Sequence, residues 1–123
     1  MNKAIIDMVM PGVTMAQLNK ETVKLITAAL KKLGLIEKDE EYRKYYMHSV
    51  GHHLGMDTHD VGPREEPLEP GHVITVEPGI YIAEEAIGVR IEDDILVTED
   101  GAVNLSVKIP KEIDQLEELC KRA

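Results

Sequence analysis

The most informative stretch of the chain is residues 48–62, which read HSVGHHLGMDTHDVG. Four of the five histidines lie in this stretch, and the fifth follows ten residues after it: His48, His52, His53, His59 and His72. Glycine and proline recur through residues 47–71, which predicts a loop rather than a long helix or strand. Because histidine is both the commonest metal ligand and a common base, the cluster indicates either a functional site or a set of packed structural side chains. The histidines alone leave both interpretations open.

The region before this loop, residues 1–46, is predicted to be helical. Thr14 followed by Gln17 is typical of a capping box, in which each side chain accepts a hydrogen bond from the backbone of the other residue. Apolar residues then recur at helical spacing as far as Leu33, which predicts one buried helix face. Gly34 is expected to end the helix because glycine adopts the left-handed conformation at little cost. The tyrosines that follow are expected to be packing residues: Tyr42, Tyr45 and Tyr46.

The region after the loop is predicted to be mostly strand. Its β-branched and alternating runs are residues 73–76, 80–82, 88–92 and 95–97. Asp100-Gly101 then predicts a hairpin, because both residues tolerate positive φ, and residues 102–105 should form the returning strand. A closing helix is expected from Pro110, with an apolar stripe at Ile113, Leu116, Leu119 and Cys120. Helices followed by strands predict a single α+β domain over residues 1–123, with an antiparallel sheet.

Two strand carboxylates add to the case for a metal site. Glu77 ends an apolar strand, and Glu92 is expected on a second strand, on the same face as Arg90. A buried carboxylate is costly unless it is paired or bound to a metal. One histidine and two glutamates can fill three positions on Zn²⁺, Mn²⁺ or Co²⁺. The alternative is that Glu92 pairs with Arg90 while Glu77 lies exposed at a strand end, and the spacing favours neither.

The overall composition limits the classes of partner. The net charge of −9 argues against binding nucleic acid or an anionic membrane through nonspecific charge. The single cysteine, Cys120, excludes an intrachain disulfide and suits a reducing compartment. The first residues lack a signal-peptide pattern, and no apolar run approaches the roughly 20 residues of a membrane span. A cytoplasmic location is therefore expected.

Three blocks of the sequence together resemble one known family. They are residues 48–62, then LEPGHVITVEPGIY at 68–81, then GVRIEDD at 88–94. In this order, they resemble the proline-specific metallopeptidases of the pita-bread type, aminopeptidase P and prolidase. The resemblance implies an α+β fold that is half of a pita bread, with a curved antiparallel sheet and flanking helices. It identifies residues 1–123 as the C-terminal portion of the catalytic domain, and the N-terminal half is expected to be absent.

The resemblance also assigns roles to individual residues. It implies that His52 is a metal ligand, that Glu77 is a ligand and the general base toward the metal-activated water, and that Glu92 bridges two metals. It further implies that His59 binds substrate and stabilises the tetrahedral intermediate. His48 would line the substrate pocket, and Arg90 would orient carboxylates near it. No functional role is implied for His53 and His72, for which the structural interpretation is kept.

The family's metal centre is dinuclear, and the resemblance implies two further aspartate ligands upstream of the histidines. Before His52 the chain offers only Asp7 and Asp39, and neither has the expected spacing or context. A mononuclear centre at most is therefore expected here. Its oxygen-rich ligands favour manganese, with zinc and cobalt as alternatives.

The function implied is metal-dependent hydrolysis of Xaa-Pro peptide bonds, with aminopeptidase P and prolidase not distinguished. The isolated chain is expected to be weak or inactive because two ligands are missing. Its expected partners are an Xaa-Pro peptide and either the missing N-terminal half or a second copy in a homodimer, because a large apolar surface would otherwise be exposed. The alternative function is a noncatalytic scaffold that binds peptides or proteins.

Overall fold

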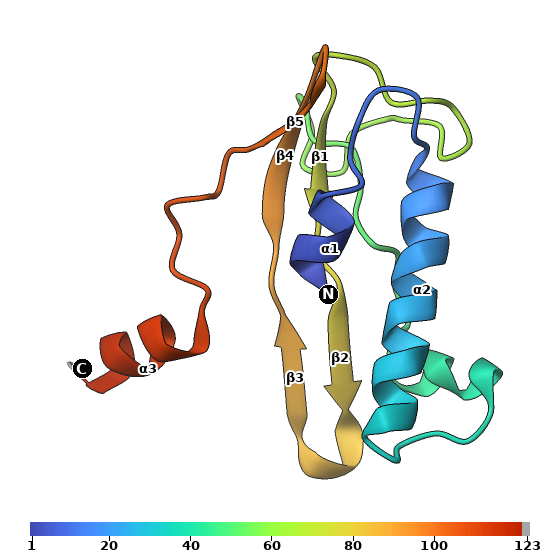
Figure 1. Cartoon of the computed structure of the whole chain (residues 1–123), viewed down its shortest axis with the longest axis vertical. Coiled ribbons are helices and arrows are strands. Elements are labelled where there is room, and N and C mark those ends of the chain that lie inside the picture. Colours follow the sequence, from blue (N-terminus) through green and yellow to red (C-terminus); the bar gives the residue numbers. More distant parts are fainter. Residues whose placement is uncertain (122–123) are drawn as a thin grey trace.

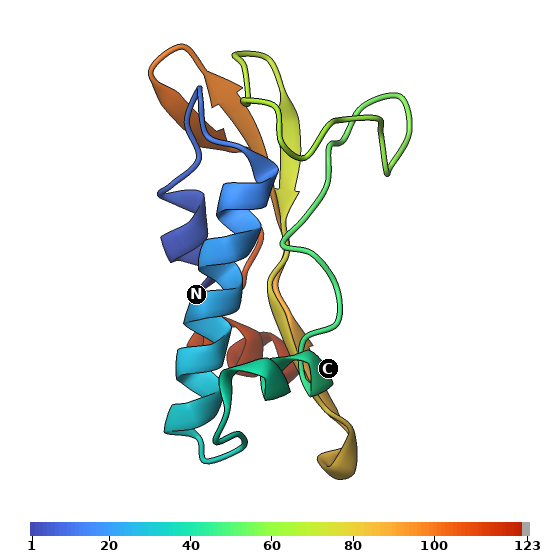
Figure 2. The ribbon, with the colours of Figure 1, turned by 90° about the vertical axis from the view of Figure 1, so that its right-hand side faces the viewer.

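A long helix and a long antiparallel ribbon form the two layers of the molecule. The computed structural model describes residues 1–121. Figure 1 shows the ribbon and the helices beside it, and Figure 2 shows the first two helices on one side of the ribbon and the loop of residues 47–71 extending on the other side. In chain order the elements are α1 (Asn2–Ile6), α2 (Met15–Lys32), the 3-10 helix η1 (Asp39–Lys44), β1 (Val73–Val76), β2 (Gly79–Ile82), the 3-10 helix η2 (Ala83–Glu85), β3 (Ile87–Arg90), β4 (Asp93–Thr98), β5 (Gly101–Asn104) and α3 (Ile113–Lys121).

The helical region confirms the sequence prediction in its details. The Thr14 hydroxyl accepts a hydrogen bond from the backbone of Gln17 at 3.1 Å, and Gln17 Oε1 accepts one from the backbone of Thr14 at 2.9 Å. This capping box begins α2, and Gly34 follows the helix with a φ of +72°. The buried face of α2 includes Leu18, Ile26 and Leu30. The apolar residues that recur at helical spacing therefore form the buried face of α2.

Two apolar clusters make up the core. The larger joins α1 and the start of α2 to β1 and β4, and it includes Ile5, Leu18, Ile74 and Ile95, all with 0% exposure. The smaller cluster joins the end of α2 to the segment after η1, where Tyr45 and Tyr46 are buried. Their burial confirms the packing role that the sequence predicts for them.

The strands are all antiparallel, and they form a three-stranded sheet in the order β1-β4-β5 and a two-stranded sheet of β2 and β3. β1 pairs with β4 so that Val76 lies opposite Asp93, and β2 pairs with β3 so that Gly79 lies opposite Arg90. Between these two pairs lie residues 77–78 on one segment and residues 91–92 on the other. Since the number is equal, one register runs through both sheets, and the two sheets form one continuous ribbon (Figure 1).

Three predictions about the strand region need correction. β3 ends at Arg90, so Glu92 lies in the gap between strands and not within a strand. The hairpin between β4 and β5 is present, but Glu99 and Asp100 form its turn while Gly101 pairs with Thr98. Neither Asp100 nor Gly101 has a positive φ, so the physical reason given for the hairpin was wrong.

The closing helix is present but begins later and packs less than predicted. α3 starts at Ile113, three residues after Pro110. Its apolar stripe is exposed: Ile113 at 74%, Leu116 at 42% and Leu119 at 51%. Among the described residues, none of the helices is both long enough and apolar enough to cross a bilayer.

Candidate metal centre

The backbone around His52 lies against the free edge of β1. The backbone N–H groups of Leu54, Thr75 and Glu77 form hydrogen bonds of 2.7–2.9 Å across this edge, to the carbonyls of Val73, His52 and Val50 respectively. Gly51 makes this approach possible, because a Cβ at Gly51 would lie 1.9 Å from the Thr75 carbonyl oxygen. The glycine therefore brings His52 to β1, which Glu77 directly follows.

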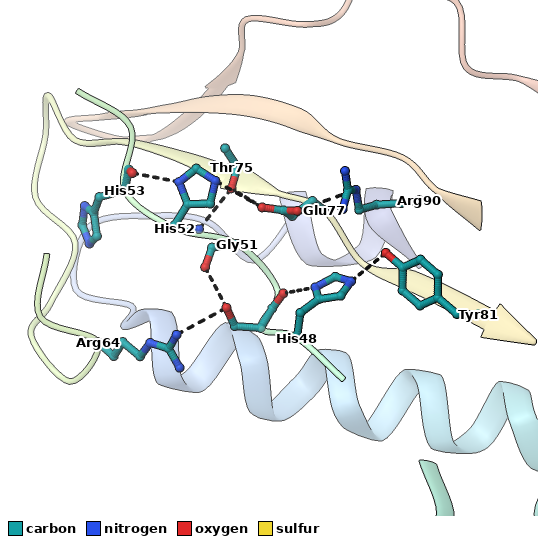
Figure 3. Close-up of polar contacts among 10 residues, drawn as sticks. His48, Gly51, His52, His53, Arg64, Thr75, Glu77, Tyr81 and Arg90 are labelled. Atoms are coloured by element: carbon teal, nitrogen blue, oxygen red, sulfur yellow. Dashed lines mark hydrogen bonds and ion pairs between the residues drawn. The ribbon is translucent and has the colours of Figure 1, made fainter. Parts of the chain in front are cut away.

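The His52 ring is held in one tautomer. Its Nδ1 lies 2.9 Å from the carbonyl oxygen of His53, which can only accept, so Nδ1 carries the hydrogen. In the neutral ring, Nε2 then presents a lone pair, and it lies 3.3 Å from Oε1 of Glu77. Figure 3 shows the two side chains pointing toward one another. Backbone hydrogen bonds of this kind are typical of metal-bound histidines, and two facing donor atoms suit a cation between them.

Glu77 is fixed at both of its oxygens. The Thr75 hydroxyl donates to Oε1 at 3.1 Å, and Arg90 Nε lies 3.8 Å from Oε2 (Figure 3). The Glu77 side chain is only 13% exposed. The alternative in which Glu77 is exposed and Arg90 pairs with Glu92 is therefore wrong, since Arg90 forms its ion pair with Glu77. A hydrogen bond with Tyr81, and then the charge of Glu77, raise the pKa of Arg90.

Glu92 completes a group of three donors. The shared register places Glu92 directly opposite Glu77 in the gap between the two sheets. One ligand atom from each of His52, Glu77 and Glu92 lies within 4.8 Å of the other two, and Glu92 is exposed. Like charges directly opposite each other destabilise a sheet, and a bound cation would remove this repulsion. The donor set therefore fits a divalent metal.

The remaining predicted site residues lie around this group. A cavity of about 470 Å³ is lined by His48, His52, His59, Glu77 and Arg90, among other residues. The exposed His59 ring lies over that of His52, with centroids 4.2 Å apart. The His48 ring is held from both sides, by the Ser49 carbonyl at 2.7 Å and the Tyr81 hydroxyl at 2.9 Å. The structure thus brings every predicted site residue together, with Glu92 within ligand distance of the group.

His53 and His72 are not part of the group of three donors, and their rings contact each other. Their rings meet edge to face with centroids 5.4 Å apart. Burial, and then the nearby His72, lower the pKa of His53. His53 Nε2 is buried without a hydrogen-bond partner among the described residues. Gly62 packs so closely that a Cβ there would lie 2.0 Å from the His53 ring. These contacts agree with a structural role for both histidines.

Sequence reasoning missed two polar residues of the site. Thr75 accepts a hydrogen bond from the backbone of His52 at 3.0 Å while it donates to Glu77, and Tyr81 holds His48. Thr75 lies in β1 two positions before Glu77, which directly follows that strand, so the period of two was a usable signal. Nothing in the sequence pattern links Tyr81 to His48. Of the upstream aspartates, Asp39 pairs with Lys31 and Asp7 ends α1, so neither joins the centre.

Comparisons with known proteins agree with this geometry. Residues 1–99 match the metallopeptidase family M24. The chain is 43% identical to Xaa-Pro aminopeptidase 3 of Rattus norvegicus, over 98% of this chain and 27% of that protein. It is also 43% identical to Xaa-Pro aminopeptidase of Haemophilus influenzae, over 95% of this chain and 32% of that protein.

The fold agrees as well. The solved structure of aminopeptidase PepP from Pseudomonas aeruginosa matches 98% of this chain with a TM-score of 0.90 and 42% identity, and the match covers 32% of that protein. This confirms the predicted α+β half of a pita-bread fold. The chain spans about a third or less of the length of these relatives.

Proposed function

The chain belongs to metallopeptidase family M24, and from this premise we propose that it provides three metal ligands and the general base of a centre that hydrolyses Xaa-Pro peptide bonds. In this proposal, residues 1–123 are the C-terminal portion of a pita-bread catalytic domain. The proposal rests above all on the convergence of His52, Glu77 and Glu92 from three separate segments to within 4.8 Å. Its relatives named Xaa-Pro aminopeptidase give the substrate class.

The three donors would hold one divalent cation, with His52 binding through Nε2 and the two glutamates through carboxylate oxygens. Such a cation, when bound, lowers the pKa of water and polarises the scissile carbonyl. Manganese is the proposed metal because oxygen ligands predominate, and zinc and cobalt are the alternatives. In the family, Glu92 would share a second metal with ligands from upstream.

Glu77 is the residue best placed to move the proton. It would accept a proton from the attacking water and deliver it to the leaving nitrogen. As the C–N bond of the tetrahedral intermediate breaks, this proton lets the nitrogen leave as the neutral secondary amine of proline. The hydrogen bond from Thr75 and the ion pair with Arg90 orient the carboxylate for this transfer.

The substrate would lie in the cavity beside these ligands. His59 is exposed at the mouth of the centre, where its ring N–H could donate to the oxyanion of the tetrahedral intermediate. His48 is fixed by two hydrogen bonds and would form one wall of the pocket. Arg90 would hold the carboxylate of Glu77 and the charged end of a peptide.

The 123 residues alone are proposed to have little or no peptidase activity. The described residues supply only one group of three possible ligands, whereas a dinuclear centre needs more. Purified chain would be titrated with Mn²⁺ by calorimetry, and hydrolysis of an Xaa-Pro tripeptide would be followed in parallel. Binding of one Mn²⁺ without turnover is the expected result.

A His52→Ala variant provides the control for this experiment, and His72→Ala is its matched partner. Only His52→Ala should lose Mn²⁺ binding. Robust turnover by the unaltered chain would refute the inactivity proposed for it. Absence of Mn²⁺ binding would instead favour the alternative function, a noncatalytic scaffold for peptides or proteins.

We also propose that the exposed apolar residues of the C-terminal region are covered in the functional assembly. Val107 is 70% exposed, Ile109 62% and Ile113 74%, and large exposed apolar patches mark association surfaces. The covering surface would be the remaining part of the catalytic domain or a second copy of this chain. A monomeric mass in light scattering at high concentration would contradict the homodimer.

A cytoplasmic location is proposed because the lone Cys120 suits a reducing compartment.

A further inference from the structure

The two carboxylate ligands lie where the ribbon loses its regular hydrogen bonds. This gap lies between the pair Val76–Asp93 and the pair Gly79–Arg90. Within it, the register places Glu77 opposite Glu92 and Pro78 opposite Ile91. The backbone N–H of Glu77 points away from β4, to the Val50 carbonyl at 2.7 Å.

The direction of the Glu77 N–H shows which backbone carbonyl in the gap lacks a hydrogen-bond donor from the opposite strand. In an antiparallel pair, hydrogen-bonded and non-hydrogen-bonded positions alternate. Glu77 and Glu92 are therefore a non-hydrogen-bonded pair, in which side chains lie closest. Pro78 and Ile91 occupy the next hydrogen-bonded position, but proline has no N–H to donate. The Ile91 carbonyl consequently receives no hydrogen bond from the strand opposite it.

Asn2 supplies the missing donor. Its side-chain amide donates to the Ile91 carbonyl at 3.3 Å and to the Val76 carbonyl at 3.0 Å. These two carbonyls belong to the peptide groups that precede Glu92 and Glu77. Figure 1 shows the start of α1 beside the junction of the two sheets. One amide therefore joins the two backbone segments at the residues immediately before both carboxylates.

Asn2 acts from the face opposite the metal ligands. Side chains alternate across a strand, so Pro78 and Ile91 point away from the cavity that Glu77 lines. Asn2, Pro78 and Ile91 line a different cavity of about 330 Å³. The hydrogen bonds of Asn2 go to the two backbone carbonyls and to the buried Asp93 side chain rather than to the ligand atoms, so Asn2 influences those atoms indirectly, through the strands that carry them.

We propose that Asn2 is a positioning residue that sets the separation of Glu77 and Glu92 by replacing the ladder hydrogen bond that Pro78 cannot make. The metal-binding part of this inference rests on the proposed function. Without the amide, the strands can spread at the gap, and the repulsion between the two carboxylates favours that movement. A centre that depends on both carboxylates then binds a cation less tightly.

The test compares Mn²⁺ affinity and stability of the chain and its Asn2→Ala variant by calorimetry and thermal melting. Asn2→Ala should weaken Mn²⁺ binding about 10-fold, as is typical when a residue supporting metal ligands is lost. Ile5→Val is the matched control, because Ile5 is fully buried on the same short helix. It should lower the melting temperature and leave Mn²⁺ affinity unchanged. Equal affinities of the unaltered chain and Asn2→Ala would overturn the proposal.

A double variant tests the role assigned to Pro78. Pro78→Ala restores a backbone N–H opposite Ile91, so Asn2→Ala should cost less affinity in that background than alone. Full additivity of the two substitutions would contradict the replacement of one donor by the other.

A measurement without metal separates this inference from the proposed function. In the metal-free chain, Asn2→Ala should shift the NMR signals of the Val76 and Ile91 carbonyl carbons. Unchanged shifts would overturn the role of Asn2. If the unaltered chain binds no Mn²⁺, the proposed metal centre is wrong, and the carbonyl shifts still decide whether Asn2 joins the strands.

Discussion

The Thr75 hydroxyl donates a hydrogen bond to Oε1 of Glu77 at 3.1 Å. The Thr75 hydroxyl oxygen, Oγ1, also accepts a hydrogen bond from the backbone N–H of His52 at 3.0 Å. Thr75 is 2% exposed, so neither bond competes with bulk water. One side chain thus connects the loop that carries the imidazole ligand to the carboxylate ligand that follows β1.

Replacing Thr75 by valine should weaken both folding and metal binding. Valine has nearly the same shape, but it leaves the His52 N–H without a partner. We expect a loss of about 1–3 kcal/mol in the free energy of unfolding, the usual cost of one unsatisfied buried donor. Urea unfolding and Mn²⁺ calorimetry would measure the two effects. Thr75→Ser keeps the hydroxyl and should retain Mn²⁺ affinity, so equal losses in both variants would argue against the hydrogen bonds.

Gly51→Ala should separate the histidine loop from β1. The new Cβ would meet the Thr75 carbonyl oxygen at 1.9 Å, and the backbone must move because neither atom belongs to a flexible side chain. Overpacking of this kind costs about 1–3 kcal/mol, and the displaced His52 should no longer reach the metal. Gly101→Ala is the matched control, since no atom lies within 4 Å of its Cβ position. If Gly51→Ala has a melting curve and an Mn²⁺ affinity close to those of the unaltered chain, this prediction is wrong.

Glu92→Gln should change stability in opposite directions with and without metal. In the metal-free chain it removes the like charge opposite Glu77 and should stabilise the fold by about 0.2–1 kcal/mol. With Mn²⁺ present it removes a ligand and should abolish most of the stabilisation by the metal. Thermal melting with and without Mn²⁺ measures both. Glu85 is an exposed glutamate on η2, and Glu85→Gln should change neither value.

The Asp93–Lys111 ion pair should make stability depend on pH. Asp93 has 0% exposure and accepts hydrogen bonds from Asn104 and Lys111. Burial alone would raise the pKa of Asp93, but Lys111 and Asn104 outweigh it and hold this pKa below its usual range. Because the folded-state pKa is lower than the unfolded value of about 3.9, the stabilisation is present above that pH. It is lost as pH falls through the folded-state pKa, and urea unfolding between pH 7 and pH 2 would measure the loss.

Removing Lys111 should reverse the sign of this dependence. Lys111→Met leaves the buried carboxylate without its cation and should cost about 3–5 kcal/mol at pH 7. Burial then dominates and raises the Asp93 pKa, so the variant should regain part of its stability as pH falls toward the raised pKa. The double variant Asp93→Asn with Lys111→Met should lose less than Lys111→Met alone. A Lys111→Met loss that is independent of pH would contradict a buried ion pair.

Local sequence signals predicted most of the fold. The capping box of Thr14 and Gln17 depends on residues three apart, and Gly34 ends α2 through its own conformational freedom. Errors arose where several segments compete for the same backbone groups. β3 stops at Arg90 because Pro78, which the register places opposite Ile91, has no N–H with which to continue the ladder. The stripe of α3 remains exposed because helical spacing specifies a face but does not provide a surface to cover it.

The sequence by itself determined which residue types are available and, for most of them, whether they lie near a strand or in a loop. It placed His52 in a glycine-rich loop and Glu77 and Glu92 beside apolar strands, but these positions lie up to 40 residues apart. Only the tertiary structure decided that Arg90 pairs with Glu77, that Tyr81 holds His48 and that Asn2 joins the two carboxylate segments. The physical reason is that each contact depends on how α1, the histidine loop and the ribbon pack together. A spacing along one segment carries no information about the partner that another segment brings.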